Sequence, residues 1–431
     1  MSEGVSLPTG VSLSQTTEGM RVVTERVESV RSLAIGLWIR TGSRDEDSAQ
    51  AGVSHFLEHL LFKGTKRHSA TEIAEIFDGI GASVNAATSK ESTHLYARFL
   101  DAHTERAFDL LSEMLLKPTY PEIDSEREVV LEEIAMYEDE PQDRVHDVLA
   151  DSVFGEHPLG KRVLGRSEVI SSIPIPDISA YHQARYTAPN IVVAAAGNLD
   201  HDEIVRLAEK HLSPAPDEVA PAPVGDAPAA GRFNFYVKDT EQYHVCFGAP
   251  GLARGDDRRF ALGILDAVLG GSASSRLFRE VREKRGLAYA VGSYSDNYLE
   301  RGLVAVYVGT REENLAELGE VVGGELEHIR NEGITAEELE RAKEHLKGRM
   351  VLGLESTSAR MSRLARSTLF DVELLSIDEL IERIDSVTLR EVADLAAELW
   401  NPEQISAACV GADEDLFRAS VGPVSEELVA A

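Results

Sequence analysis

The sequence has little of what several classes of protein require. Its only cysteines are Cys246 and Cys409, which excludes a disulfide framework and a four-thiolate zinc site, as is usual in a reducing compartment. Its longest apolar stretches, such as 32–39 and 191–196, fall far short of the roughly 20 residues that cross a bilayer. The first residues, MSEGVSLPTG, resemble neither a secretory signal nor an Arg-rich transit peptide. These absences predict a cytoplasmic protein without a membrane span.

Positive charge is also scarce. The 431 residues include 43 Lys and Arg against 74 Asp and Glu, so the formal net charge is −31. Such a surface repels phosphate backbones, and nucleic-acid binding is not expected as a main function. The 43% of hydrophobic and 27% of charged residues are typical of globular proteins and exclude wholesale disorder. The length predicts two or three domains, each with its own core.

A repeat at a fixed offset predicts two related halves. Tyr186, followed by TAPN and IVVAAAGN, lies 214 positions before Trp400, followed by NPE and QISAACVGA. The same offset carries the Glu-Arg pair at 126–127 onto the pair at 340–341. We therefore expect an ancient tandem duplication of one structural unit.

The boundary between the halves is expected in the stretch 213–231. It is rich in Pro, Ala and acidic residues and has no apolar periodicity, which is typical of a linker. The predicted domains are therefore a first half over 1–212, this linker, and a second half over 232–431.

Both halves contain strand and helix patterns. Alternating or apolar runs predict strands at 33–41, 93–99, 233–237, 244–248 and 303–308. Apolar residues at helical spacing predict helices at 53–62, 70–79, 107–116, 125–138 and 336–348. Strand pairs alternate with helices, which favours a mixed, largely antiparallel sheet covered by helices over a doubly wound parallel sheet. The predicted fold class is α+β, in two related units.

An HxxEH sequence lies within one predicted helix, at His55-Phe-Leu-Glu58-His59. Residues four apart share a helix face, so His55 and His59 can point two imidazoles at one ion, with Glu58 beside them. Zinc binds neutral imidazoles and a carboxylate and leaves a position for a water whose pKa it lowers to about 7. Glu58 would accept the proton of that water and pass it to a leaving amine. Because such a grouping also arises by chance, a third ligand is needed to decide.

The third ligand is expected on the helix predicted over 125–138. On a helical wheel, Glu133 is centred on an apolar stripe, and a carboxylate there is costly unless it is paired or bound to a metal. Glu126, on the same face two turns earlier, would orient a ligand by hydrogen bonding. Glu128 and Glu132 point toward the solvated side and are expected to be surface charges. The apolar neighbours of Glu133 on the wheel are Val129, Val130, Met136 and Tyr137.

With these residues, the sequence resembles the pitrilysin-type metallopeptidases, or inverzincins. HFLEH is followed, 74 residues after its second His, by the glutamate of EREVVLEE. The flanking AGVSHFLEHLLFKGT and the two-half length are most similar to the processing-peptidase-like branch of that family. The resemblance covers essentially the whole chain. It implies one zinc ion per chain bound by His55, His59 and Glu133, with Glu58 as general base and Glu126 as supporting carboxylate.

The second half departs from this motif. No HxxEH occurs between residues 232 and 431, and the 214 offset places Lys347 at the position of the glutamate ligand. The resemblance therefore implies one metal-binding half and one degenerate half, which together form a two-bowl clamshell around a chamber.

The resemblance also assigns residues to peptide binding. Gly81–Thr88 is similar to an edge strand to which the substrate adds as a further strand, with hydrogen bonds at Asn85 and Ala86. An ordinary turn into a strand explains this segment equally well. Gly270 and Gly271 are similar to a flexible loop that contacts incoming peptides, although a plain loop before a helix gives nearly the same sequence.

Four further side chains follow from the same resemblance. Arg282 and Tyr289 match an Arg and a Tyr, seven residues apart, that reach the substrate backbone and the zinc site, where Tyr289 would stabilise the oxyanion. Asp143 and Asp147 lie where processing peptidases hold a substrate arginine, and as i and i+4 residues both can face a guanidinium. An arginine preference is thus a hypothesis, in a chain that is acidic nearly everywhere.

The sequence therefore predicts a zinc endopeptidase acting on short or unfolded, presequence-like or basic peptides. The first alternative is a non-catalytic scaffold or partner subunit of a processing-peptidase-like assembly, although such proteins typically lack an intact motif. A metallochaperone is the second, for which the Arg and Tyr pair would be superfluous. The expected partners are peptide substrates and a second copy of the chain, or a related subunit in a heterodimer, with neither nucleic acid nor a membrane.

Overall fold

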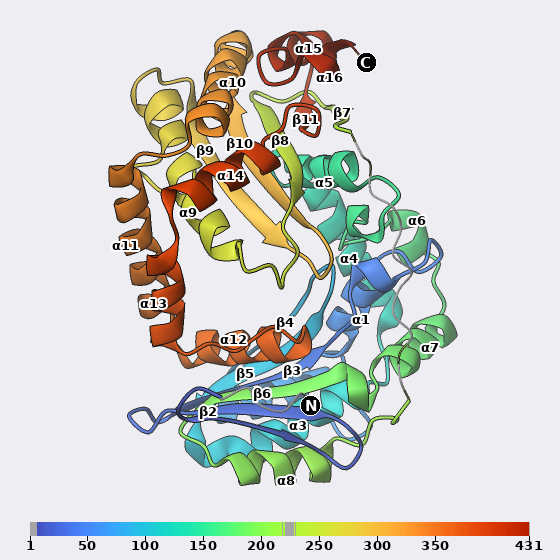
Figure 1. The fold of residues 1–431 in the computed structure, drawn as a ribbon. Coiled ribbons are helices and arrows are strands. Elements are labelled where there is room, and N and C mark those ends of the chain that lie inside the picture. Colours follow the sequence, from blue (N-terminus) through green and yellow to red (C-terminus); the bar gives the residue numbers. More distant parts are fainter. Residues whose placement is uncertain (1–6, 218, 220–227, 229, 431) are drawn as a thin grey trace. The chain divides into compact units, whose positions relative to one another are not determined.

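The structure is a computed structural model, and it describes all residues except 1–6, 218, 220–227, 229 and 431. The chain forms two compact units (Figure 1). Unit 1 contains the described residues of Met1–Ile134, Lys161–Pro223 and Val351–Ser376. Unit 2 contains the described residues of Ala135–Gly160, Val224–Met350 and Ile377–Ala431. Each unit therefore takes residues from both halves of the sequence.

Unit 1 is built on a six-stranded sheet in the order β1-β2-β6-β3-β5-β4. Its strands are β1 (Val11–Gln15), β2 (Arg21–Arg26), β3 (Ser32–Ile39), β4 (Ser83–Thr88), β5 (Thr93–Leu100) and β6 (Ile191–Gly197). β2 and β6 run parallel, and the other neighbouring strands run antiparallel. β4 lies at one edge of the sheet.

The helices of unit 1 are α1 (Val53–Leu60), α2 (Ala70–Gly79), α3 (Thr104–Leu116), α4 (Ile123–Asp139), α6 (Ser167–Ile170), α7 (Ile175–Arg185), α8 (His201–His211) and α12 (Thr357–Leu369). The last turn of α4 belongs to unit 2. On one face of the sheet, Ile35 and Leu37 of β3 pack in the larger core with Phe56 of α1. On the other face, Trp38 of β3 packs with Leu364 of α12. Because both faces are covered, β3 is a continuous apolar run rather than an alternating one.

Unit 2 repeats this plan with five strands in the order β7-β11-β8-β10-β9. They are β7 (Phe233–Val237), β8 (Tyr243–Gly251), β9 (Ala288–Asn297), β10 (Gly302–Thr310) and β11 (Ser406–Gly411). Its helices are α5 (Pro141–Phe154), α9 (Arg259–Leu269), α10 (Leu315–Glu332), α11 (Ala336–Gly353), α13 (Ile377–Ser386), α14 (Leu389–Leu399), α15 (Glu414–Val421) and α16 (Glu426–Ala430); the last residues of α11 belong to unit 1. β7 and β11 are the parallel pair, as β2 and β6 are in unit 1.

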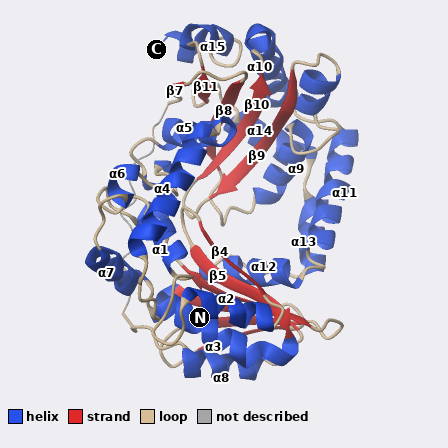
Figure 2. Cartoon of the chain, turned by 180° about the vertical axis from the view of Figure 1, so that it is seen from behind, coloured by secondary structure: helices blue, strands red, loops and turns tan. Residues whose placement is uncertain are grey.

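The duplication predicted from the sequence is present in the fold. Shifted by 214 positions, α7 takes the bounds of α14, and α5 overlaps α12. The two overlapping helices, however, each pack on the sheet of the other half. α5 comes from the first half and packs on β8 and β11 (Figure 2). α12 comes from the second half and packs on β3 and β6 (Figure 1).

The predicted boundaries 1–212, 213–231 and 232–431 differ from the two units in these segments. Residues 135–160 join unit 2 and residues 351–376 join unit 1, because the apolar faces of α5 and α12 are buried there. Apolar periodicity shows that a helix has a buried face but does not show which sheet that face will cover. Within the predicted linker, residues 218, 220–227 and 229 lie outside the described residues.

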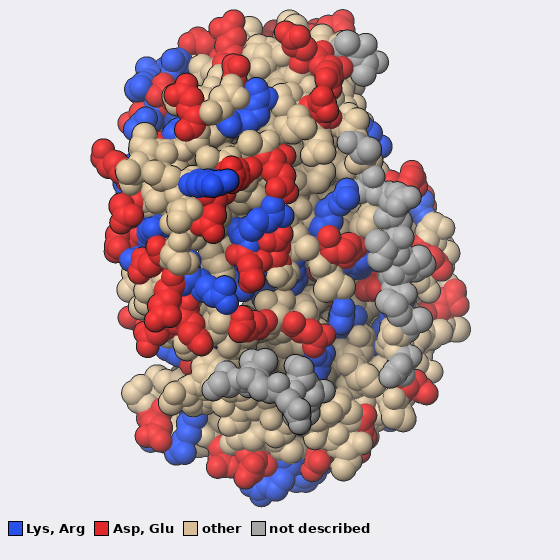
Figure 3. All heavy atoms as spheres, in the orientation of Figure 1, with Lys and Arg blue, Asp and Glu red and all other residues tan. Residues whose placement is uncertain are grey.

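Most predicted elements are present, with shifted ends. The helix predicted over 70–79 and the strand predicted over 233–237 have the bounds of α2 and β7. The helix predicted over 336–348 runs on to Gly353 as α11. Among the described residues, every helix is too short or too polar to cross a bilayer. The face drawn in Figure 3 carries many Asp and Glu side chains, with Lys and Arg side chains distributed among them.

Candidate metal centre

The helix that carries HxxEH begins at a fixed point in the chain. Gly52, just before α1, has φ of 96°, and an added Cβ would lie 2.7 Å from the carbonyl oxygen of Leu164, so glycine is required there. The N–H groups of Gly52 and Ser54 donate to the carboxylate of Glu46, at 2.7 and 2.8 Å. Glu46 is buried, and it satisfies two N–H groups that a helix start leaves without a partner. It thereby fixes the start of α1.

His55, His59 and Glu133 form one group of candidate metal ligands. His55 Nε2 lies 3.7 Å from Glu133 Oε1, and His59 Nε2 lies 3.3 Å from Glu133 Oε2. One ligand atom from each residue lies within 4.8 Å of the others. Within the part of the chain that the structure describes, this is the group of three His, Cys, Asp or Glu side chains close enough to share an ion. α1 supplies the two imidazoles and α4 supplies the carboxylate.

The charge states of His55 and Glu133 suit a divalent cation. Burial, with a smaller contribution from His59, lowers the pKa of His55 to about 4, so this imidazole is neutral at neutral pH. A hydrogen bond with His59 lowers the pKa of Glu133, which is therefore ionised. Burial lowers the pKa of His59, but hydrogen bonds with Glu133 and Glu126 outweigh it and raise that pKa. Two imidazoles and one carboxylate are a donor set that zinc prefers.

The helical-wheel argument for Glu133 is wrong in one respect. Val129 and Met136 are 50% and 65% exposed, so the stripe centred on Glu133 does not face the core. The buried side of α4 is formed by Val130 and Ile134. Glu133 lies at the border of that side, with a side chain that is 44% exposed. The two histidines, rather than core burial, are what its carboxylate faces.

Glu58 lies beside the three candidate ligands and against the edge strand. Burial raises the pKa of its carboxyl, and hydrogen bonds with Thr88 of β4 act in the opposite direction. A carboxyl group with a raised pKa holds a proton more readily at neutral pH than a solvated one. Its position and its pKa suit a group that takes up and releases a proton.

Glu126 is buried behind His59. Its Oε1 lies 2.8 Å from His59 Nδ1, so the other ring nitrogen, Nε2, is directed to Glu133 and the candidate metal position. The other oxygen, Oε2, lies 2.5 Å from Lys63 Nζ. The sequence predicted a supporting role for Glu126 but not the contact with Lys63. Lys63 lies four residues after His59. If the helix continued that far, this spacing would place Lys63 on the same helix face as His59.

Asn85 and Ala86 lie on β4, the edge strand of unit 1. Ala86 faces the core, and Asn85 is exposed. The N–H of Ala86 donates to Oδ1 of Asn85 at 2.9 Å, so the side chain of Asn85 occupies a donor that an added strand would use. β4 is an edge strand, but a further strand could use this donor only after the Asn85 side chain releases it. Peptide binding at β4 stays a prediction.

Arg282 and Tyr289 contact each other in unit 2. Arg282 Nη1 donates to the carbonyl oxygen of Tyr289 at 3.1 Å, and the guanidinium lies 4.4 Å from the centre of the Tyr289 ring. Tyr289 is 78% exposed, so its hydroxyl is available to a ligand. Both residues belong to unit 2, whereas the candidate metal ligands belong to unit 1. Their predicted reach to the zinc site stays a prediction.

Asp143 and Asp147 both lie on α5 but differ in their surroundings. Asp147 Oδ2 lies 3.8 Å from Nη1 of Arg144, a cation of its own helix. Asp143 is exposed. A substrate arginine would therefore compete with Arg144 at Asp147 and meet open solvent at Asp143.

The two glycines predicted as a loop are explained by close packing. A Cβ on Gly270 would lie 2.3 Å from the backbone nitrogen of Ser293 on β9, and one on Gly271 would lie 3.1 Å from the carbonyl oxygen of Asp266. Contact with a peptide stays a prediction for both.

At the position equivalent to Glu133, Lys347 pairs with Glu344 and Asp385, at 2.7 and 2.8 Å.

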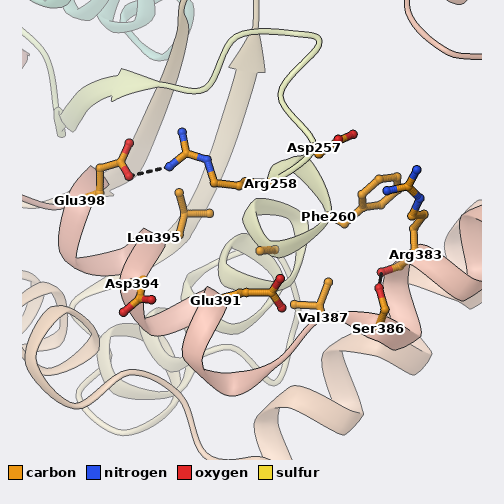
Figure 4. A pocket seen from close by; sticks show the side chains of 11 residues that line it. Asp257, Arg258, Phe260, Arg383, Ser386, Val387, Glu391, Asp394, Leu395 and Glu398 are labelled. Carbon is orange, nitrogen blue, oxygen red and sulfur yellow. Dashed lines mark hydrogen bonds and ion pairs between the residues drawn. The ribbon is translucent and has the colours of Figure 1, made fainter.

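Unit 2 also contains a pocket of about 290 Å³, formed by the start of α9 and by α13 and α14 (Figure 4). Arg258 lines this pocket and pairs with Glu398 at 2.6 Å. The hydroxyl of Ser386 donates to the carbonyl oxygen of Arg383 at 2.8 Å. None of the residues predicted as functional from the sequence lines this pocket.

Two family models match the chain in succession. Residues 21–167 match the model described as insulinase, peptidase family M16, and residues 172–346 match the model described as peptidase M16 inactive domain. The first match contains all three candidate metal ligands, and the second begins before the predicted linker. The division into a metal-bearing half and a degenerate half stays a prediction.

Curated relatives are similar over nearly the whole chain. An uncharacterized zinc protease of Streptomyces coelicolor is 44% identical, over 88% of this chain and 85% of that one. The uncharacterized zinc protease YmxG of Bacillus subtilis is 42% identical, over 89% of this chain and 94% of that one. An uncharacterized zinc protease of Mycobacterium tuberculosis is 41% identical, over 91% of each chain.

Solved structures share the fold. A protease from Helicobacter pylori superposes with a TM-score of 0.88 at 24% identity, covering 94% of this chain and all of that one. A peptidase M16 inactive domain from Pseudomonas fluorescens gives a TM-score of 0.86 at 24% identity, covering 94% and 98%. The family models and the identity to the curated relatives show that the chain belongs to peptidase family M16.

Proposed function

We propose that the chain is a zinc-dependent endopeptidase that hydrolyses peptide bonds in short or unfolded peptides. The observation that carries this proposal is the placement of one ligand atom each from His55, His59 and Glu133 within 4.8 Å of one another. Glu58 lies beside them with a pKa raised by burial. The names of the relatives, zinc proteases, point to the same metal and the same reaction.

His55, His59 and Glu133 would hold the zinc ion, one per chain, and leave one position open. When bound, zinc polarises a peptide carbonyl and makes a water molecule more acidic. Glu126 orients His59 through the bond to its Nδ1, so that Nε2 faces the metal position.

Glu58 carries the proton in this proposal. Its carboxylate takes a proton from the attacking water and delivers it to the nitrogen of the leaving amine. Burial raises the pKa of Glu58, which favours the protonated form that the second of these steps needs. Hydrogen bonds with Thr88 hold the carboxyl group next to β4, where an added substrate strand would place its scissile bond.

Four finer points belong to the same proposal. The net charge of −31 favours basic, presequence-like peptides by long-range attraction. Tyr289 would donate to the developing oxyanion, with Arg282 stacked on its ring. The assembly is a homodimer, or a heterodimer with a related subunit. Two buried free cysteines favour a reducing compartment such as the cytoplasm.

The test compares the purified chain with Glu58→Gln and, as a control, with Glu128→Gln on the exposed side of α4. We expect cleavage of a quenched basic peptide by the wild type and by Glu128→Gln, and its loss on addition of a chelator. Glu58→Gln should keep its zinc and lose at least about 100-fold in kcat, as is typical for removal of a general base. Zinc-loaded wild type that cleaves no peptide would contradict the proposal and favour a scaffold.

A further inference from the structure

We propose that Lys63 is a positioning residue of the metal centre, which holds the Glu126 carboxylate against His59 and so sets the affinity for the metal. This inference rests on the proposed function, because it concerns the metal that the three ligands would bind. It adds a residue outside the HxxEH sequence and outside the glutamates of α4.

The contacts form a continuous chain from Lys63 to the ligand group. Lys63 Nζ lies 2.5 Å from Glu126 Oε2, and Glu126 Oε1 lies 2.8 Å from His59 Nδ1. The opposite ring nitrogen, His59 Nε2, lies 3.3 Å from Glu133. All four residues lie in unit 1, so their geometry is that of one compact body. A change at the lysine can therefore reach the metal position through two side chains.

The burial of Glu126 explains why a cation is needed there. Its side chain is only 6% exposed, and a carboxylate removed from water must have both oxygens bonded. The ring nitrogen of His59 serves one oxygen, and the ammonium group of Lys63 serves the other. Without that cation, the carboxylate would turn toward water, and His59 would lose the partner that fixes its ring.

Charge balance adds to this argument. Glu133 and Glu126 lie on one helix and both contact His59, so two carboxylates converge on one imidazole. Like charges this close repel, and an ammonium group beside one of them reduces the repulsion. The Lys63 side chain is 30% exposed but that of Glu126 is only 6% exposed, so removing the lysine would leave a buried carboxylate without its cation. We therefore expect loss of Lys63 to lower the affinity for the metal and, to a lesser extent, the stability of the fold.

The experiment measures zinc dissociation constants by competition with a chromophoric chelator, on the full chain. Lys63→Met should weaken zinc binding by about 10- to 100-fold, as removal of a partner behind a ligand typically does. Lys63→Arg keeps the charge and should restore most of the affinity. Lys210→Met is the matched control. Lys210 also forms an ion pair at 2.5 Å, but its partner is Glu105, which is not part of the metal group.

A double-mutant cycle identifies the path of the effect. If Lys63 acts through Glu126, Lys63→Met should cause no further loss in a Glu126→Gln background. The absorption spectrum of the cobalt-loaded chain should change in Lys63→Met and return in Lys63→Arg, which a purely structural role would not produce. If Lys63→Met does not fold, Lys63→Gln takes its place in the cycle.

Wild-type affinity in Lys63→Met, or losses that simply add in the double variant, would overturn the inference while leaving zinc binding by the wild type intact. Absence of zinc binding by the wild type would overturn the proposed function and the inference together. The two failures are thus distinguishable in one series of titrations.

Discussion

Two carboxylates at the starts of α1 and α2 differ in how burial and hydrogen bonding shift their pKa values. Glu46 accepts hydrogen bonds from two N–H groups, which favour its charged form. The effect of burial is larger and raises the pKa of Glu46 from 4.5 to about 7. Glu72 caps the exposed start of α2, where hydrogen bonds from Ser69 dominate and lower its pKa. The same chemical group at a helix start therefore shifts in opposite directions, according to its access to water.

This contrast predicts how stability depends on pH. Because the pKa of Glu46 is raised in the folded state, its protonation stabilises the fold below about pH 4.5, and this contribution is lost as pH rises through about 7. The free energy of unfolding of the wild type, relative to Glu46→Gln, should therefore fall between pH 5 and pH 8. Urea denaturation at several pH values measures it. Glu72→Gln is the control and should show no such slope over this range, since its pKa is lowered.

Some residues of the site are related by their spacing along the sequence, and others come together only in the folded chain. His55, Glu58 and His59 were predictable because helix geometry relates positions four apart. Glu133 was predicted from a helical wheel and then from the family resemblance, and the exposed Val129 shows that the wheel argument rested in part on a false premise. Lys63 and Glu46 were missed, because each acts through a contact that only the folded chain creates.

At the scale of elements, the start of α1 depends on a backbone that only glycine adopts easily. Gly52→Ala would place a side chain at φ of 96° and 2.7 Å from the oxygen of Leu164. We expect it to destabilise the fold by about 1–3 kcal/mol and to lower zinc content, because α1 would shift. Gly348→Ala is the control, since Gly348 lies inside α11 with no atom within 4 Å of the added Cβ. It should stabilise by about 0.5–1 kcal/mol. Thermal denaturation of both variants measures these changes. An equal loss of stability in the two variants would contradict this account of α1.

The bounds of helices and strands were easier to predict than the sheet on which each helix packs. β7 and α2 were predicted with their bounds, because period and local breakers define them. The exchange of α5 and α12 was not, although both have an apolar face. Which sheet a helix covers depends on the path of the chain between elements, and periodicity contains no information on that path.

At the scale of the whole molecule, the exchange predicts that the two halves of the sequence depend on each other. The first half, 1–212, lacks α12, so Trp38 and the apolar face around it would be open to water. The second half, 232–431, lacks α5, which covers Cys246 and its neighbours. Exposed apolar faces of this kind cause aggregation. Expressed alone, each fragment should be insoluble or fail to unfold cooperatively, and expressed together they should copurify.

Gel filtration and circular dichroism of the fragments test this dependence. The control is the full chain cleaved within 213–231, which should stay together because no exchanged helix is removed. A monomeric, cooperatively folded 1–212 fragment would contradict the interdependence of the halves.

The central claim, that His55, His59 and Glu133 bind one zinc ion, is tested most directly by the zinc content of three purified chains. Glu132 and Glu133 are neighbours on α4, but Glu132 is exposed and only Glu133 faces the two histidines. We predict one zinc per chain in the wild type and in Glu132→Gln, and little or none in Glu133→Gln, with all three chains folded by circular dichroism. Equal zinc content in all three chains, or none in the wild type, would contradict the account.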